Sequence, residues 1–144
     1  MPAEASNVIA IESDSDVVAA RQRARELAAE LELSSTDQTL LATAISEVAR
    51  NITTYARRGE VSVSIVVDGR GRRGIRVIAS DHGPGIADIE RAMQHGYTTG
   101  GGLGLGLPGA RRLVDDFDIE SAPSQGTTVT LVKWARQVPR SVRA

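Results

Sequence analysis

Two neighbouring apolar runs limit the folds that are open to this chain. In VSVSIVVD, residues 61 to 68, an apolar side chain recurs at every second position from Val61 to Val67, which predicts a strand with one buried face. The turn-like GRGRR and a second apolar run, GIRVIAS, follow, so the pair predicts an antiparallel hairpin. A sheet with one apolar face needs a second layer to cover it.

Two segments before the hairpin have the apolar period of helices that can form this layer. The first covers residues 14 to 32 and follows the candidate N-caps of SDSD. The second runs from LSSTDQ to about residue 56, with Ser35 or Thr36 predicted as its N-cap. Its apolar stripe is the clearest in the chain and consists of Leu41, Ile45, Val48, Ile52 and Tyr55.

The remaining residues predict short strands and helices around this centre. In chain order we expect a strand at 7–12, a short helix at 87–95, a glycine-rich mobile loop at 96–109, a helix at 110–117, strands at 118–123 and 127–134, and a frayed tail at 135–144. The predicted fold class is therefore α+β: a two-layer sandwich whose mostly antiparallel sheet is covered on one face by helices. Residues 1–144 are expected to form a single domain.

Composition excludes several classes of function. There is no cysteine, so thiolate metal sites and disulfides are excluded, and the cytoplasm is the expected compartment. The formal net charge of −1 argues against a nucleic-acid partner, and no signal peptide or membrane span is expected. The only lysine is Lys133, near the end of the chain, which rules out a Walker A loop and the strand lysine of conventional protein kinases.

Glu47 and Asn51, in the segment ISEVARN, are the first candidate pair for chemistry. They are four residues apart and therefore share one helix face, on the shoulder of the apolar stripe. A glutamate can take a proton, and an asparagine carbonyl is a hard oxygen ligand that suits Mg²⁺. Taken alone, such a pair is so common that ordinary helix surface is the better explanation.

Asp81 ends the apolar run VIAS and is followed by HGPG, in which Gly83 and Gly85 flank a stiff proline. Its carboxylate can accept a hydrogen bond from an exocyclic amine, while the glycines let the backbone approach a planar ligand. An Asx-type turn bond accounts for the same sequence. Thr127, at the start of the last predicted strand, can join Asp81 or serve only as a strand former.

The segment GGGLGLGLPGARRL is the third candidate. Gly102, Gly104 and Gly106 alternate and run directly into a predicted helix. Exposed backbone N–H groups beside a helix N-terminus form an anion site without a lysine. A plain flexible connection has the same composition.

In their order and spacing these motifs resemble the GHKL ATPase superfamily, which includes gyrase, Hsp90, bacterial histidine kinases and MutL, and the resemblance covers nearly the whole chain. It implies the Bergerat ATP-binding fold, with ATP and Mg²⁺ as cofactors. It also implies that Glu47 is the catalytic base and Asn51 the Mg²⁺ ligand. Asp81 then accepts the adenine amine beside Gly83, Gly85 and Thr127. The residues matching the phosphate-covering lid are Thr98, Thr99, Gly102, Leu103, Gly104, Leu105 and Gly106.

Within the superfamily, AISEVARNITTYA, GGLGLGLPGARRLVDDF and the closing VKW are most similar to the anti-sigma-factor-type serine kinases, in particular stressosome switch kinases of the RsbT type. The resemblance implies a protein serine/threonine kinase that phosphorylates STAS-domain antagonist or scaffold proteins and, once released, activates a PP2C-type phosphatase. A homodimer is compatible with this branch. The alternative is an anti-sigma factor that holds a sigma factor in a nucleotide-dependent way. The lid has no lysine, and no arginine lies between Arg91 and Arg111, so the group that meets the γ-phosphate is left open.

Overall fold

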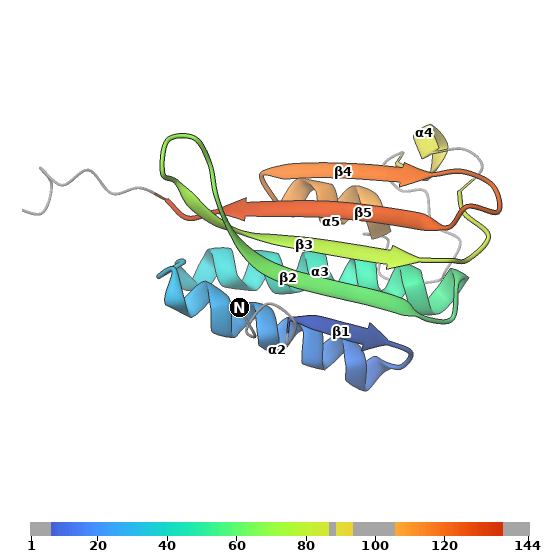
Figure 1. The fold of residues 1–144 in the computed structure, drawn as a ribbon, viewed down its shortest axis with the longest axis horizontal. Helices are drawn as coiled ribbons and strands as arrows, with labels where there is room; N and C mark the ends of the chain where they lie inside the picture. The colour runs from blue at the N-terminus through green and yellow to red at the C-terminus, as the bar shows by residue number, and fades with distance from the viewer. Residues whose placement is uncertain (1–6, 87–88, 94–105, 137–144) are drawn as a thin grey trace, which may run out of the picture.

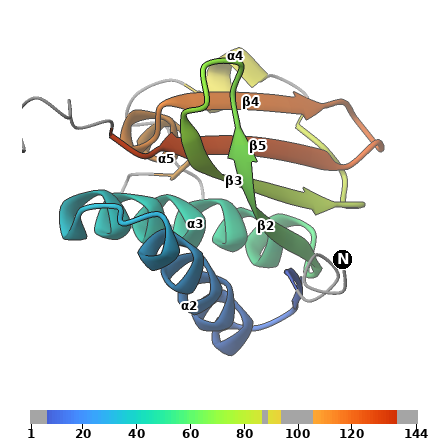
Figure 2. The same cartoon turned by 60° about the vertical axis from the view of Figure 1, so that its left-hand side comes forward.

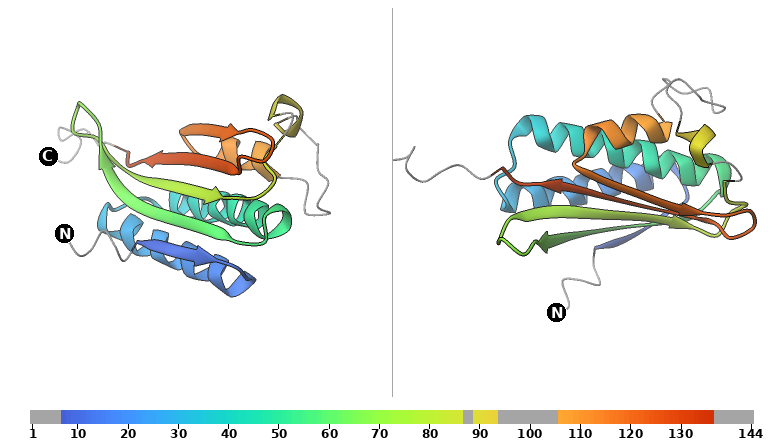
Figure 3. Two further views of the ribbon diagram at one scale, coloured as in Figure 1. Left: turned by 45° about the vertical axis from the view of Figure 1, so that its right-hand side comes forward. Right: turned by 90° about the horizontal axis from the view of Figure 1, so that it is seen from above.

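The computed structural model describes residues 7–86, 89–93 and 106–136. Within these residues, the three longer helices lie on one face of a five-stranded antiparallel sheet with the strand order β1-β2-β3-β5-β4 (Figure 1; Figure 3, right). This arrangement confirms the predicted two-layer α+β sandwich. In chain order the elements are β1 (Val8–Ile11), α2 (Asp14–Glu30), α3 (Ser35–Tyr55), β2 (Gly59–Val67), β3 (Arg73–Asp81), α4 (Ile89–Ala92), α5 (Gly106–Leu113), β4 (Asp116–Ser121) and β5 (Thr127–Trp134).

Helix α3 lies at the centre of the helical layer, because its apolar stripe is almost completely shielded from water. Leu41, Ile45, Val48 and Ile52 are each at most 1% exposed, whereas Tyr55 is 48% exposed. The stripe packs with buried sheet residues that include Val61, Val63, Ile75, Val77, Val129 and Leu131. No described helix is long and apolar enough to cross a membrane.

The N-cap of α3 is Ser34, so the predicted Ser35 or Thr36 is wrong by one or two residues. Ser34 has an extended backbone, and its side chain accepts a hydrogen bond of 3.0 Å from Asp37 N. The chain reaches this cap through Glu32, whose φ of 59° turns it out of α2. Ser34, Ser35 and Thr36 are chemically equivalent as N-caps, so their side chains do not decide which of them begins the helix. The position of the turn at Glu32 decides it.

The β2–β3 hairpin confirms the predicted pairing but not the full extent of the predicted burial. Val61 and Val63 are completely buried, whereas Ile65 and Val67 are 36% and 61% exposed. The tip of the hairpin rises away from α2 and α3 (Figure 2), so neither of these helices covers its apolar side. Alternation identifies the face of a strand, but it cannot show where the covering helix ends.

Helix α5 begins four residues before the predicted helix and ends at Leu113, so the predicted helix at 110–117 is wrong at both ends. Pro108 lies in its first turn, where no backbone N–H is needed. Phe117, predicted to be helical, lies in β4 and pairs with Leu131 of β5. The described end of the predicted mobile loop, from Gly106, is helical, and Leu107 is buried.

The ends of two other predicted elements are described only in part. The short helix expected at 87–95 corresponds to α4, which is four residues long. In the expected frayed tail, Ala135 N donates a hydrogen bond of 2.7 Å to Arg73 O, and Arg136 pairs with Asp37. Residues 137–144 lie outside the described residues.

Candidate functional site

Asp81 and Thr127 are neighbours in one row that crosses four strands. Asp81 pairs with Gly59 on β2 and with Thr127 on β5, and Thr127 pairs in turn with Ser121 on β4. Directly paired residues of antiparallel strands point to the same face, and this face is the one that the helices cover. Asp81 and Thr127 are only 8% and 5% exposed. The row therefore places polar side chains at the edge of an apolar core.

The Asp81 carboxylate divides its two oxygens between different environments. Oδ1 accepts a hydrogen bond of 2.8 Å from Gly83 N, which is the Asx-type turn considered from the sequence. The other oxygen receives no hydrogen bond from any residue that the structure describes. The turn bond and the role of amine acceptor are thus compatible, since one oxygen fixes the side chain and the other stays available.

Ser121 ties the turn after Asp81 to the turn before Thr127. Its Oγ accepts a hydrogen bond of 2.7 Å from Ile86 N and donates one of 2.9 Å to Gly126 O. It also lies 2.8 Å from Thr127 Oγ1. Because the single serine proton goes to Gly126 O, Thr127 is the donor in that contact, which leaves its oxygen lone pairs free to accept.

Glycines hold the backbone segments around this row in close contact. A Cβ on Gly83 would lie 2.6 Å from the Cβ of Ala56, at the C-cap of α3. A Cβ on Gly85, whose φ is 78°, would overlap Ala122 O. One on Gly126, whose φ is 76°, would overlap Asp81 O. The structure therefore gives Gly83 and Gly85 a packing role, in addition to any contact with a ligand.

Glu47 and Asn51 lie on the part of α3 that leads to this row. Asn51 precedes Ala56 by five residues and Glu47 by nine, so they are about 7.5 and 13.5 Å from it along the helix axis. Both are partly buried at the margin of the apolar stripe. Glu47 Oε2 is 3.8 Å from the Arg50 guanidinium, and its side chain is 11% exposed, whereas that of Arg50 is 55% exposed.

The structure thus places the described candidates toward one end of the fold. Gly106 begins α5, and α5 starts at the end of the molecule where β3 ends (Figure 1). The other predicted lid residues lie outside the described residues: Thr98, Thr99, Gly102, Leu103, Gly104 and Leu105.

Three residues at this end were missed by the sequence reasoning. Gly59 is needed because a Cβ there would overlap Ser80 O and lie 3.0 Å from the Asp81 Cβ. Ser121 and Gly126 bridge the two turns described above. Gly126 has a local signal in the turn SQG, but Gly59 and Ser121 become recognisable only through their strand register.

The comparison with known protein families agrees with this arrangement. The model of the histidine kinase-, DNA gyrase B-, and HSP90-like ATPases matches residues 36–137, which span α3 to the end of β5. The chain belongs to this ATPase family. The predicted resemblance to the GHKL superfamily is confirmed.

Among the described residues, no group of three or more His, Asp or Glu side chains could hold a metal ion.

Curated relatives of this family member cover most of its length. The chain is 47% identical to the serine/threonine-protein kinase RsbT of Bacillus subtilis over 128 residues, which cover 89% of this chain and 96% of the relative. It is 29% identical to the anti-sigma F factor of Bacillus subtilis over 121 residues, which cover 79% of this chain and 81% of the relative. These findings agree with the predicted enzyme class, an ATP-dependent protein serine/threonine kinase.

Solved structures share the fold of this ATPase at lower identity. The RsbU and RsbW domains of a Mycobacterium tuberculosis protein match with a TM-score of 0.58 and 22% identity, over 91% of this chain and 33% of that one. The mycobacterial sensor histidine kinase MprB matches with a TM-score of 0.52 and 22% identity, over 70% of this chain and 74% of that one.

Proposed function

We propose that this ATPase-family member is a protein serine/threonine kinase of a bacterial stress-signalling, partner-switching module. It transfers the γ-phosphoryl group of Mg-ATP to STAS-domain antagonist or scaffold proteins of a stressosome and, after release from them, activates a PP2C-type phosphatase. The observation that carries this proposal is the 47% identity with a serine/threonine kinase over 89% of the chain. The cytoplasm and a homodimer remain predictions.

The described residues fit the adenine end of an ATP molecule. Asp81 offers one carboxylate oxygen with no partner among the described residues, which matches the amine donor of adenine. Thr127 offers hydroxyl lone pairs in the adjacent strand, and Ser121 fixes the orientation of that hydroxyl. This donor and acceptor pattern favours adenine over guanine, which carries a carbonyl where adenine carries the amine.

Glu47 and Asn51 fit the phosphate end of the same molecule. Asn51 supplies one amide oxygen, which suits Mg²⁺ because this ion keeps several waters and binds substrate phosphates. When bound, Mg²⁺ neutralises charge on the phosphates. Glu47 takes the proton of the acceptor hydroxyl, and the Arg50 guanidinium at 3.8 Å holds its carboxylate in place.

A transfer assay with purified components tests this proposal. We expect the chain to move label from [γ-³²P]ATP to a serine or threonine of a STAS-domain protein encoded beside its gene, only when Mg²⁺ is present. The matched control is the same STAS protein with each candidate acceptor replaced by alanine. ATP hydrolysis without labelling of any STAS protein would contradict the kinase assignment and leave the ATPase assignment standing.

A second candidate function is favoured by the 29% identity with an anti-sigma F factor over 79% of the chain. In this case the chain binds a sigma factor, and the nucleotide controls the complex. Size-exclusion chromatography with the sigma factors of the source organism, with ATP and with ADP, separates the two functions. A nucleotide-dependent sigma complex in the absence of STAS phosphorylation would favour the anti-sigma factor.

A further inference from the structure

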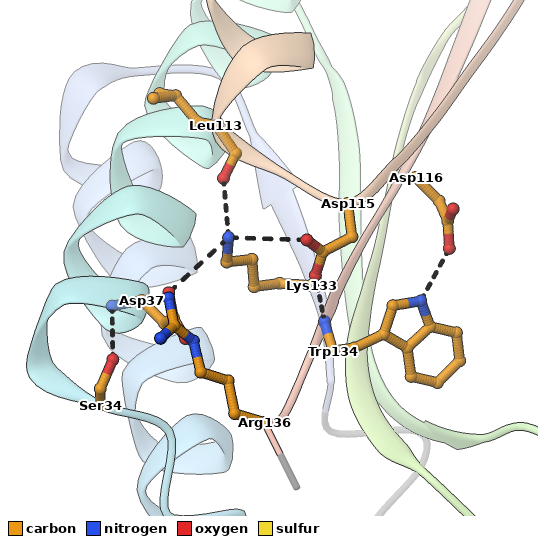
Figure 4. A network of polar contacts seen from close by, with 8 residues as sticks. All are labelled: Ser34, Asp37, Leu113, Asp115, Asp116, Lys133, Trp134 and Arg136. Atoms are coloured by element: carbon orange, nitrogen blue, oxygen red, sulfur yellow. Dashed lines mark hydrogen bonds and ion pairs between the residues drawn. The ribbon is translucent and has the colours of Figure 1, made fainter. Parts of the chain in front are cut away.

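The opposite end of β5 carries a second polar cluster that the proposed reaction does not use. Lys133, the only lysine of the chain, is 9% exposed. Its Nζ is 3.7 Å from Asp37 Oδ1, 3.9 Å from Asp115 Oδ1 and 3.3 Å from Leu113 O (Figure 4). Six residues of extended strand separate Lys133 from Thr127, about 20 Å. The cluster is therefore remote from the candidate nucleotide site.

An open groove of about 490 Å³ adjoins this cluster. It is lined by Asp37, Arg72, Asp115, Lys133, Trp134, Ala135 and Arg136. The Trp134 indole points away from Lys133 toward Asp116, whose Oδ2 accepts a hydrogen bond of 2.8 Å from Nε1 (Figure 4). The Arg72 guanidinium lies 4.4 Å from the centre of the indole ring. Trp134 is also the only tryptophan of the chain, so its fluorescence reports on this groove.

The carboxylates that line the groove already have partners. The two oxygens of Asp37 pair with Lys133 and with Arg136 Nε, at 3.7 and 3.5 Å. Asp115 Oδ1 faces Lys133, and its Oδ2 accepts a hydrogen bond of 2.7 Å from Trp134 N. Few acceptors are left for an incoming group.

The arginines of the groove, in contrast, have N–H groups that their ion pairs do not use. Arg136 is 81% exposed in its side chain and uses only Nε, so its two terminal nitrogens have no partner among the described residues. Arg72 likewise uses only Nε in its ion pair with Asp68. The groove lining itself carries three basic side chains, Arg72, Lys133 and Arg136, against two acidic ones, Asp37 and Asp115. The excess of one positive charge contrasts with the net charge of −1 for the whole chain.

An exposed apolar strip lies beside this donor-rich groove. Ile65 and Val67 are 36% and 61% exposed on the projecting hairpin. Ile65 and Lys133 both pair with Ile75, from opposite sides, so they share the helix-facing side of the sheet. A ligand that reaches Arg136 and Lys133 can therefore also cover apolar side chains.

We propose that this groove is a docking site for an acidic segment of a partner protein, in which an Asp or Glu carboxylate pairs with Arg136 while an adjacent apolar residue packs on Ile65 and Val67. A protein segment fits better than a nucleic acid, because the carboxylates of Asp37 and Asp115 interrupt the basic surface that a phosphate backbone would need. The proposal does not depend on the reaction at the other end of the sheet.

Titration of the full chain with designed peptides, followed by Trp134 fluorescence, tests the docking site. One capped peptide repeats Glu-Leu-Ser, and the matched peptide has Gln in place of each Glu. We expect saturable binding of the Glu peptide that weakens with added salt, and at least tenfold weaker binding of the Gln peptide.

Two pairs of variants connect the binding to this surface. Arg136→Gln should weaken binding of the Glu peptide about tenfold, whereas Arg25→Gln, an exposed arginine of α2, should not. Val67→Ser should also weaken it, whereas Val18→Ser, at the 52% exposed Val18, should not. All four variants should keep the circular dichroism spectrum and the Mg-ATP affinity of the wild type.

Several outcomes would overturn the docking site. These are no binding of the Glu peptide, equal binding of the Gln peptide, or equal effects of Arg136→Gln and Arg25→Gln. Tighter binding of an oligo-dT strand than of the Glu peptide would identify the surface as a nucleic-acid site instead. If the wild-type protein does not bind Mg-ATP, this result contradicts the proposed kinase function but not the docking site.

Discussion

The two ends of the paired strands β3 and β5 differ in the hydrogen-bonding groups that they leave without partners: acceptors at one end and donors at the other. At the Asp81 end, a carboxylate oxygen and a threonine hydroxyl can still accept hydrogen bonds. At the Lys133 end, the carboxylates are engaged and the terminal nitrogens of Arg136 can still donate. One sheet therefore presents an acceptor site and a donor site, and the two should be separable by mutation.

The largest effect is expected from Glu47→Gln at the acceptor end. The amide keeps the size of the side chain but cannot take a proton, so phosphoryl transfer should slow by about a hundredfold or more. Mg-ATP binding, measured by calorimetry, should stay close to the wild-type value. The companion variant Asn51→Ala should instead lose Mg-ATP affinity. Near wild-type transfer by Glu47→Gln would remove its assignment as the base.

Asp37→Ala should have the largest effect on stability, and it acts at the donor end. The Asp37 carboxylate is 4% exposed and faces both Lys133 and Arg136. Its loss leaves Lys133 with Asp115 as its one carboxylate partner beside the Leu113 carbonyl, so we expect a decrease of about 2–4 kcal/mol in the free energy of unfolding, near the usual cost of breaking a buried pair. Urea denaturation measures this decrease, with Asp115→Ala as the milder control because Asp115 is 42% exposed. Mg-ATP affinity of the folded variant should not change.

The acceptor end was easier to predict from the sequence than the donor end. Asp81, Gly83 and Gly85 lie within five residues, and Glu47 and Asn51 lie within one helical turn, so their grouping depends on local spacing. The row from Gly59 to Ser121 depends on the register of four strands, which local patterns do not fix.

The donor end and the helix boundaries depend on tertiary contacts that no short pattern encodes. Asp37 and Lys133 are 96 residues apart in the sequence, and only the sandwich brings them together. The start of α5 was mispredicted because glycine-rich composition indicates a loop, whereas Leu107 is buried among core residues and supports a helix there. Ile65 and Val67 were expected to be covered, because the alternation of the strand continues past the last helical contact.

Asp81→Asn should weaken ATP binding, whereas the matching change at the donor end should not. The amide oxygen can still accept the hydrogen bond from Gly83 N, so the turn is retained, but the second acceptor becomes a donor that opposes the adenine amine. ATP affinity should fall about 10- to 100-fold, as expected for one mismatched buried polar contact. Calorimetric titration with ATP and GTP should also show a smaller preference for ATP. The matched control is Asp37→Asn at the donor end, which should bind ATP like the wild type; equal binding by Asp81→Asn would mean that the aspartate serves only the turn.

The smallest effect is expected from Asp68→Asn in the turn that supports the donor end. Burial raises the pKa of Asp68, but hydrogen bonds from the backbone N–H groups of Arg72 and Arg70 and from the Arg72 side chain outweigh it, and the pKa lies below its ordinary value of 3.8. A lowered pKa means that the carboxylate stabilises the fold at pH values above 3.8 and that this stabilisation is lost as the pH falls through the folded-state pKa. The variant should therefore melt slightly below the wild type at pH 7, and the difference should shrink as the pH falls below 3.8. Glu30→Gln, at an exposed glutamate with no partner among the described residues, is the matched control and should show no such pH dependence. Because Asp68 also holds Arg72 over the Trp134 ring, Asp68→Asn should shift the tryptophan emission at pH 7; an unchanged spectrum would mean that Arg72 keeps its place by stacking alone.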